Sequence, residues 1–235
     1  MSRLDDLNRL YGILEDLRTR VGGYRYLRDC DKRTGWPDQG VYFFFEPGEL
    51  RGNGTQLRVV RVGTHAVSEG SRTTLWNRLS QHRGTMGASH AGGGNHRGSI
   101  FRLHVGTALL NRDGYTEELR ELWFRLHVSP EERHREYPLE KDVSDHIRAM
   151  PFLWVAVPGP ASKTSDRSLI ESNCVGLLSN KGKAAIDPPS SGWLGHYADR
   201  AAVRESGMWN VDFVDNEYDP SFLDVLARYV TQMGV

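Results

Sequence analysis

Hydrophobic residues recur every three or four positions near the start of the chain. Residues 2–19 place their leucines and isoleucine on one side of a helix, at Leu4, Leu7, Leu10, Ile13, Leu14 and Leu17. Gly22 and Gly23 end the pattern, which predicts a helix over 2–19. A second amphipathic pattern starts at Asp219-Pro220 and runs to Tyr229. We therefore expect an amphipathic helix at each end of the chain.

Runs of aromatic and β-branched residues predict three strands. Residues 40–46 and 57–62 flank a segment over 47–54 that is rich in turn-forming residues, which predicts a hairpin with a fairly long connection. Residues 151–157 predict a third strand, which Pro158-Gly159-Pro160 closes.

The segments around the third strand are mostly helical in pattern. The predicted helices are one capped by Thr73 or Thr74 and ending near Gln81, one over 115–127, one starting at Ser129 and one over 166–179. Residues 84–98 are rich in Gly, Ser and His and predict a loop. Repeats and a clear linker are both lacking in the sequence, so we expect a single domain over 1–235.

Composition narrows the class of protein. Hydrophobic residues make up 38% of the 235 positions and charged residues 26%, which favours a packed core over global disorder. The formal net charge is zero, so contact with nucleic acid would need a local basic patch. Cys30 and Cys174 are too few for a disulfide scaffold or a four-ligand zinc site. Without a signal peptide or an apolar run of about 20 residues, we expect a soluble cytoplasmic protein with no membrane partner.

Four polar residues stand out as candidates for chemistry. Tyr42 lies in the middle of a predicted strand, and a phenol accepts a proton only when nearby cations stabilise the phenolate. Arg78 and His82 are four apart on one helical face and could bind phosphate and move a proton. Glu171 lies beside buried helical positions, where a carboxylate needs a cation such as magnesium. Each also has a simpler interpretation, as a strand aromatic, a solvated helix face or a salt-bridged surface residue.

A basic segment over 61–102 surrounds two of these residues. The segment holds several arginines but a single acidic residue, Glu69. Its glycines allow close approach of the backbone to a ligand. The residues that we expect to contact DNA are Arg61, His65, Arg72, Arg83, His96 and Arg97. The alternative is a charged loop balanced by acidic residues elsewhere in the chain.

Taken in order, these motifs resemble those of the GIY-YIG nuclease family. The resemblance rests on Gly40-Val41-Tyr42, Arg61-Val62-Gly63, Arg78, Glu171 and Asn180, and it spans approximately residues 40–180 with an insertion over approximately 84–150. The spacing from Arg78 to His82 is similar to that of the restriction-endonuclease branch. One position departs from the family pattern, because Arg61 stands where the second motif has a tyrosine.

The resemblance implies both a fold and an activity. The fold would be α+β, a small central antiparallel β-sheet flanked by helices, with a helical insertion and N- and C-terminal helices. The activity would be that of a DNA endonuclease dependent on Mg2+ or Mn2+, of a restriction or genome-defence type, for which a homodimer is an open alternative. The implied catalytic residues are Tyr42, Arg78, His82, Glu171 and Asn180, with Glu171 as the metal ligand and Asn173 as a second candidate for the asparagine. The rival interpretation is a catalytically impaired DNA-binding protein, which Arg61 favours.

Overall fold

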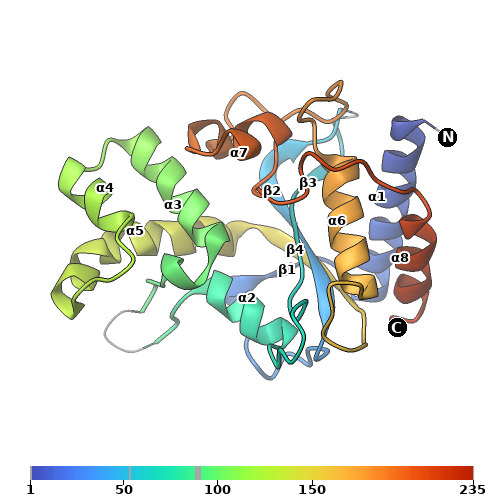
Figure 1. Ribbon diagram of the computed structural model, residues 1–235, viewed down its shortest axis with the longest axis horizontal. Coiled ribbons are helices and arrows are strands. Elements are labelled where there is room, and N and C mark those ends of the chain that lie inside the picture. Colours follow the sequence, from blue (N-terminus) through green and yellow to red (C-terminus); the bar gives the residue numbers. More distant parts are fainter. Residues whose placement is uncertain (1, 53, 88–90, 235) are drawn as a thin grey trace.

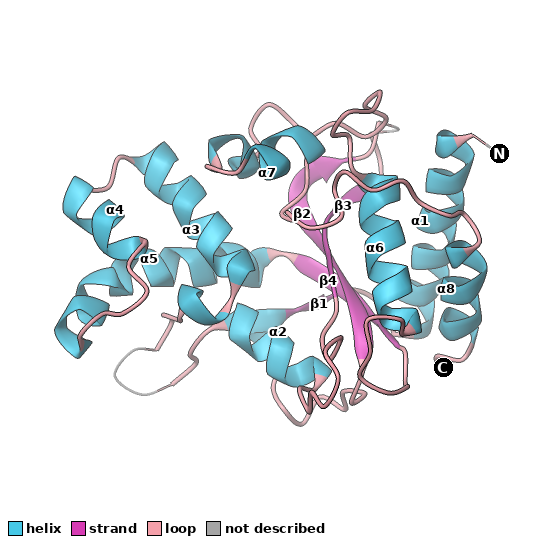
Figure 2. Cartoon of the chain, viewed as in Figure 1, coloured by secondary structure: helices cyan, strands magenta, loops and turns pink. Residues whose placement is uncertain are grey.

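The computed structural model describes residues 2–52, 54–87 and 91–234. Residues 88–90 of the predicted loop lie outside this range. The described chain folds as α+β, with one antiparallel sheet between two layers of helices (Figures 1 and 2). This confirms the fold class that the sequence predicts.

The sheet has four strands in the order β1-β4-β2-β3. The strands are β1 Arg25–Tyr26, β2 Gly40–Leu50, β3 Leu57–Gly63 and β4 Pro151–Ala156. The three predicted strands are confirmed, and the hairpin is formed by β2 and β3. The prediction of a turn from residue 47 onward is wrong, because β2 continues to Leu50, which pairs with Leu57. Strand β1 was not predicted, since two residues are too few to show a period.

Eight helices surround this sheet in the part of the chain that the structure describes. They are α1 Arg3–Arg20, α2 Leu75–Arg83, α3 Ile100–Asp113, α4 Glu117–Trp123, α5 Pro130–Ala149, α6 Asp166–Leu178, α7 Ala201–Ser206 and α8 Phe222–Thr231. The sequence predicts both terminal helices, α2, α5 and α6, whereas α4 is shorter than its predicted range. Helix α3 was missed because nine of its residues are buried, so it lacks a clear polar face.

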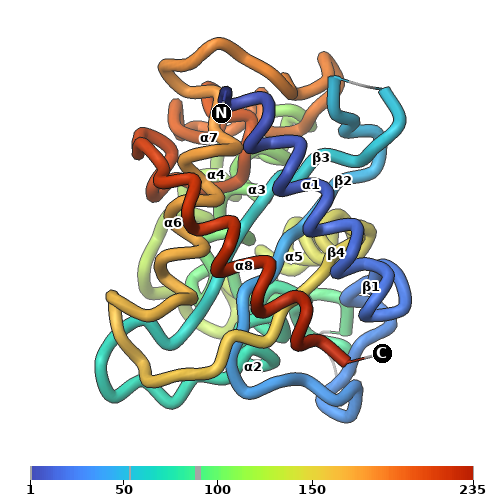
Figure 3. Tube along the Cα trace, turned by 90° about the vertical axis from the view of Figure 1, so that its right-hand side faces the viewer, coloured from blue at the N-terminus to red at the C-terminus, as the bar shows by residue number. Residues whose placement is uncertain are grey.

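The helices divide between the two faces of the sheet. Helices α1, α6 and α8 cover one face, where α1 and α8 lie side by side (Figure 3). Helices α2, α3 and α5 cover the other face, and α4 packs against α5 at the far end of that layer (Figure 1). Over the described residues, every helix is too short or too polar to cross a membrane.

Strand β2 is buried on both sides, which explains its run of aromatic residues. Val41, Phe43 and Phe45 pack toward α1, α6 and α8. Tyr42 and Phe44 point to the opposite face and pack with residues of α2 and α3. Successive side chains of a strand alternate between faces, so a strand between two helical layers needs large side chains on both. Tyr42 therefore enters the layer that contains the predicted arginine helix.

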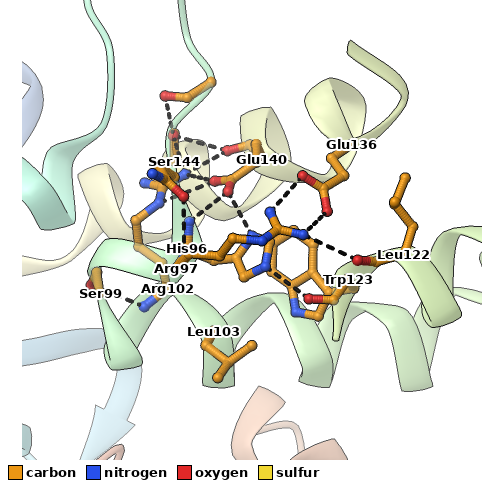
Figure 4. A network of polar contacts seen from close by, with 12 residues as sticks. His96, Arg97, Ser99, Arg102, Leu103, Leu122, Trp123, Glu136, Glu140 and Ser144 are labelled. Carbon is orange, nitrogen blue, oxygen red and sulfur yellow. Dashed lines mark hydrogen bonds and ion pairs between the residues drawn. The ribbon is translucent and has the colours of Figure 1, made fainter. Parts of the chain in front are cut away.

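The insertion between α2 and β4 is tied together by buried ion pairs (Figure 4). Arg102 of α3 is fully buried and bonds to Glu140 of α5, with 3.1 Å from its Nε to the carboxylate. Arg97 forms a two-pronged pair with Glu136, also on α5. These contacts join α3 and the segment before it to α5.

Candidate active site

Tyr42 and His82 meet inside the layer between β2 and α2. The phenol oxygen of Tyr42 lies 2.8 Å from Nε2 of His82. Helix α2 begins at Thr74, whose hydroxyl caps the backbone N–H of Asn77, and it ends at Gly84 with positive φ. Leu75, Leu79 and His82 form its buried face, so the amphipathic pattern itself directs the imidazole toward the sheet. The pair joins a phenol to a base that is forty residues away in sequence.

His82 is neutral in this setting. Burial lowers the pKa of its imidazole well below the usual value, and the positive charges of Arg78, Arg61 and Arg102 lower it further. Its second ring nitrogen, Nδ1, lies 2.8 Å from the hydroxyl of Ser99. A neutral imidazole with one nitrogen on a phenol can exchange a proton with that phenol at ordinary pH.

Glu171 lies on α6 with a partly buried side chain beside the end of β3. Burial raises the pKa of its carboxyl to about 7, against the opposing effects of the Arg61 charge, a backbone hydrogen bond from Thr64 and the Arg78 charge. Asp212 also raises this pKa. Burial destabilises the charged carboxylate, so a carboxylate in this setting gains from binding a metal ion or a positive side chain.

The same two arginines influence both His82 and Glu171. Arg78 is partly exposed on α2, and its Nη1 donates to Gln81 at 3.1 Å. Arg61 is buried, donates from Nη1 to the Trp209 carbonyl at 2.8 Å and lies over the Phe101 ring. Its Nε has no hydrogen-bond partner among the described residues. Arg61 and Arg78 therefore lie near both Glu171 and His82, and His82 in turn contacts Tyr42.

Arg61 lies on this side of the sheet because it pairs with Phe44, next to a bulge in β3. Phe44 pairs with Arg61 and Phe45 with Val59, so Val60 is the extra residue. Val60 and Arg61 both contact the layer that contains Phe101. The bulge therefore adds Val60 on this side as a second consecutive residue, beside the guanidinium of Arg61.

The glycines of both motif tripeptides mark close approaches. A Cβ at Gly63 would lie 2.2 Å from the phenol oxygen of Tyr42, and one at Gly40 would lie 2.5 Å from the carbonyl oxygen of Val155. Both distances are too short for any side chain. Gly63 also pairs with Tyr42 across the hairpin, so the second motif forms a wall against which the Tyr42 ring rests.

The two candidate asparagines do not join this cluster through any hydrogen bond that the structure shows. Asn180 lies after α6, where its amide donates to the Asp187 carbonyl and its oxygen accepts from Arg3 and from the Ile186 backbone. Asn173 donates to the Leu169 carbonyl and accepts from the Asp219 backbone. Asn180 thus stabilises the turn after α6, and Asn173 ties α6 to the segment before α8.

The residues expected to contact DNA fall into two groups. Arg72 is exposed in the loop before α2. Apart from Arg61, the remaining four residues form hydrogen bonds within the protein. His65 bonds with the backbone of Gly40 and Thr73, and Arg83 donates to the Cys30 carbonyl. His96 bonds with Glu140 and the Trp123 carbonyl, and Arg97 pairs with Glu136. The expectation that His96 lies on an open basic loop is corrected, because its ring is buried against Trp123.

Two residues of the site escaped sequence reasoning. Ser99 caps α3 and contacts His82, and a serine before Ile100-Phe101 is a helix-start signal that could have revealed the missed helix. Arg167 is buried on α6 and donates to the carbonyls of Ala66, Val157 and Pro160. Arg167 thereby holds the helix of Glu171 against the loop that follows β3, and no local pattern announces that role.

The family model described as a GIY-YIG domain matches residues 1–235, the whole chain. The chain belongs to the GIY-YIG family. No curated protein and no solved structure matches the chain. A GIY-YIG domain is a nuclease-type domain, so membership implies a DNA endonuclease and DNA as its substrate.

GIY-YIG nucleases generally depend on a divalent metal ion, and the residues of this site are compatible with binding one. Among the described residues no three His, Cys, Asp or Glu side chains gather into a metal cluster. Mg2+ does not need such a cluster, since it keeps several waters and binds through one or two carboxylates plus substrate phosphate oxygens. Glu171 is a carboxylate of this kind, partly desolvated and beside the arginines that would receive the phosphate.

Proposed function

We propose that this GIY-YIG protein is a DNA endonuclease that depends on Mg2+ or Mn2+ and hydrolyses phosphodiester bonds. The observation that supports it best is the contact of 2.8 Å between the Tyr42 phenol and a neutral, buried His82. A fully buried phenol needs a hydrogen-bond partner in any case, and here that partner is an imidazole next to three arginines. Hydrolysis of a phosphodiester does need a proton acceptor for water and positive charge for the phosphate.

In this proposal the chain's own residues divide the work. Tyr42, aided by His82, orients the attacking water and accepts its proton. Arg78 binds a non-bridging phosphate oxygen, an electrostatic contribution of about 2–4 kcal/mol to the transition state. Glu171 would hold the metal ion, which when bound supplies positive charge to the phosphate and the leaving oxygen. Asn180 supports the turn after α6 and so acts at a distance from the reacting atoms.

DNA would approach through the partly exposed and exposed cations near α2. Arg72 is exposed and Arg78 partly exposed, while Arg61 is an interior cation beside them. Next to α2 a cavity of about 660 Å3 is lined by Gln81, which accepts from Arg78, and by Arg133 of α5. Because the net charge of the chain is zero, affinity for phosphate would have to come from these local cations.

We further propose a restriction or genome-defence role, because His82 follows Arg78 by one helical turn as in the restriction-endonuclease branch that the sequence resembles. A palindromic target would require a symmetric dimer of this chain. Sedimentation of the protein alone and with DNA fragments measures that state directly.

The second candidate is a catalytically impaired DNA-binding protein. It is favoured by Arg61, a buried arginine at the second-motif position where the family pattern has a tyrosine hydroxyl. In that case the cluster would bind a phosphate without cleaving the bond next to it.

A plasmid-nicking assay with Mg2+, and with EDTA as control, separates the two functions. We expect the wild-type chain to nick and the Tyr42→Phe variant to be slower by about 100-fold or more in single turnover, the range of general-base effects. The variant should still fold, because only one buried hydrogen bond is lost, at about 1 kcal/mol. An undiminished rate in Tyr42→Phe would show that the phenol only packs, and no nicking by wild type would favour the binding protein.

A further inference from the structure

The cavity of about 660 Å3 beside α2 lies between this helix and α5. Gln81 of α2 lines one side of the cavity and Arg133 of α5 lines another, while the segment before α3 supplies a third wall. Gln81 also accepts a hydrogen bond of 3.1 Å from Nη1 of Arg78. One side chain therefore connects the cavity to the helix arginine of the candidate active site.

The two carboxylates that line the cavity are already neutralised within the protein (Figure 4). Glu136 forms a two-pronged pair with Arg97, at 2.7 and 2.8 Å. Glu140 pairs with Arg102 and also accepts the backbone N–H of His96 at 2.6 Å. Because these partners cancel the negative charge of the carboxylates, the acidic residues do not make the cavity repel an anion.

Arg133 is a lining cation that has no such partner. Its side chain is exposed, and in the part of the chain that the structure describes no carboxylate, carbonyl or hydroxyl accepts a hydrogen bond from its guanidinium. Arg135, two residues further along α5, pairs with Glu118 at 2.9 Å instead. The cavity thus offers one unpaired positive charge, together with neutral hydrogen-bonding groups such as the Gln81 amide.

We propose that this cavity binds a phosphate of the DNA backbone that neighbours the phosphate at Arg78, with Arg133 as its cation. The inference rests on the proposed function, which supplies DNA as the ligand. Phosphates follow one another about every 3.4 Å along the axis on each strand, so a strand held at Arg78 carries further phosphates past Gln81. An arginine fork binds two oxygens of such a phosphate at once.

The lining favours a phosphate over a nucleobase. Tyr137 is the one aromatic residue among the described residues of the lining, and its hydroxyl donates to the Ala91 carbonyl at 2.6 Å. Pockets for an extruded base stack it between aromatic or apolar side chains. A phosphate needs a cation and hydrogen-bond donors instead, which Arg133 and Gln81 supply.

The direct test is the affinity for a labelled DNA duplex over a range of salt concentrations, with EDTA present to prevent cleavage. For Arg133→Gln we expect about 10-fold weaker binding at low salt, the scale of one hydrogen bond to a charged group. The dependence of log Kd on log salt concentration should become shallower by about 0.9, because one phosphate fewer is neutralised. The loss should be equal for duplexes of unrelated sequence, since phosphates carry no sequence information.

Arg135→Gln is the matched control for charge. It removes the same charge from the same helix, but its guanidinium is paired with Glu118 and does not line the cavity. It should change the affinity by less than about 2-fold and leave the salt dependence as in wild type. Equal losses in the two variants would show that Arg133 adds only to the general positive field. A loss that depends on the base sequence would show a base contact, and either result would overturn the proposal.

A neutral substitution tests the cavity itself. Gly98 lines the cavity, and a Cβ there would meet nothing within 4 Å, so a larger side chain fits and fills part of the space. Gly98→Leu should weaken duplex binding several-fold without changing the charge. Gly12→Leu, at an equally open position on α1, should not. Circular dichroism checks that both variants fold, and an unchanged affinity in folded Gly98→Leu would exclude the cavity as the phosphate site.

Cleavage separates this site from the proposed function. If the wild type cleaves DNA, Arg133→Gln should lower kcat/KM chiefly through a higher KM, since Arg133 holds the strand away from the reacting bond. If the wild type does not cleave but only Arg133→Gln of the two arginine variants weakens binding, the endonuclease function fails and the phosphate site stands. If the wild type cleaves and both arginine variants bind alike, the site fails and the endonuclease function stands.

Discussion

At the scale of single residues, close packing explains why glycine and tyrosine occur at positions 63 and 42. Gly63 allows the Tyr42 ring to lie directly against the β3 backbone, because a Cβ there would be 2.2 Å from the phenol oxygen. Tyr42 itself is turned toward His82 by the alternation of β2. The second motif therefore helps to orient the first, even though Arg61 replaces its tyrosine.

Gly63→Ala should impair both stability and cleavage. The added methyl forces the Tyr42 ring to move, which costs about 1–3 kcal/mol as an overpacked core does. Urea unfolding and single-turnover cleavage measure the two effects. Gly12→Ala is the control, since its Cβ meets nothing within 4 Å inside α1 and should stabilise the protein by about 0.5–1 kcal/mol. Equal behaviour of the two variants would contradict the close packing at Gly63.

His104 is a buried histidine outside the proposed chemistry. It is 2% exposed, and neither ring nitrogen has a hydrogen-bond partner among the described residues. Burial, together with the Arg61 charge, lowers the pKa of its imidazole to about 4. Between pH 4 and its unfolded value of 6.5, the unfolded chain therefore binds more protons at this position than the folded chain.

Stability should fall by about 2–3 kcal/mol through His104 as the pH decreases from 7 to 4. The contribution is fully present above the unfolded pKa and is lost as the pH falls through the folded value. His104→Leu removes the titrating group and the unpaired ring nitrogens, so its free energy of unfolding should exceed that of wild type by more at pH 4.5 than at pH 7. Parallel pH profiles for the two proteins would rule out a buried neutral His104.

At the scale of elements, the insertion is built on charge pairs buried between helices. Arg102 on α3 bonds to Glu140 and Ser144 on α5 and to the His82 carbonyl on α2. Arg97, before α3, pairs with Glu136 on α5. Three elements thus share one polar network, and breaking it leaves a buried charge unpaired.

Glu140→Ala should destabilise the protein by about 3–5 kcal/mol, the cost of removing one partner from a buried ion pair. The reason is Arg102, which is fully buried and would keep its charge without a carboxylate. Chemical denaturation measures the loss. Glu121→Ala, at an exposed glutamate of α4, is the matched control and should stay within about 0.5 kcal/mol of wild type. A similarly small effect at Glu140 would refute the network's role.

At the scale of the whole molecule, the candidate site lies where the edge strand β3 meets both helical layers. Glu171 approaches from α6 on one side of the sheet, while Tyr42, His82 and Arg78 belong to the other side. The carboxylate of Glu171 and the cations that we propose to bind phosphate therefore come from separate layers, so they can be removed independently.

Glu171→Ala should abolish Mg2+-dependent cleavage and leave DNA binding unchanged. The substitution removes the proposed metal ligand, whereas Arg72 and Arg78 remain to bind the backbone. Fluorescence anisotropy with a labelled duplex measures binding, and plasmid nicking measures cleavage. Full cleavage by the variant would remove Glu171 from the site, and a parallel loss of affinity would show that it acts on folding or DNA contact instead.

The sequence by itself determined the elements that have a strong local period and the order of the polar residues along them. The terminal helices, the β2–β3 hairpin, α2 and α6 all follow from spacing within one segment. Helix α3 and strand β1 did not, since a nearly all-buried helix and a two-residue strand show no usable period. Only the tertiary structure decided which polar groups meet: it placed Ser99 on His82, engaged Asn180 in a turn and paired Arg97 and His96 with α5. The Ser99–His82 and His96–Glu140 contacts join residues 17 and 44 positions apart in the sequence. At such separations burial and hydrogen-bond satisfaction, not local spacing, select the partner.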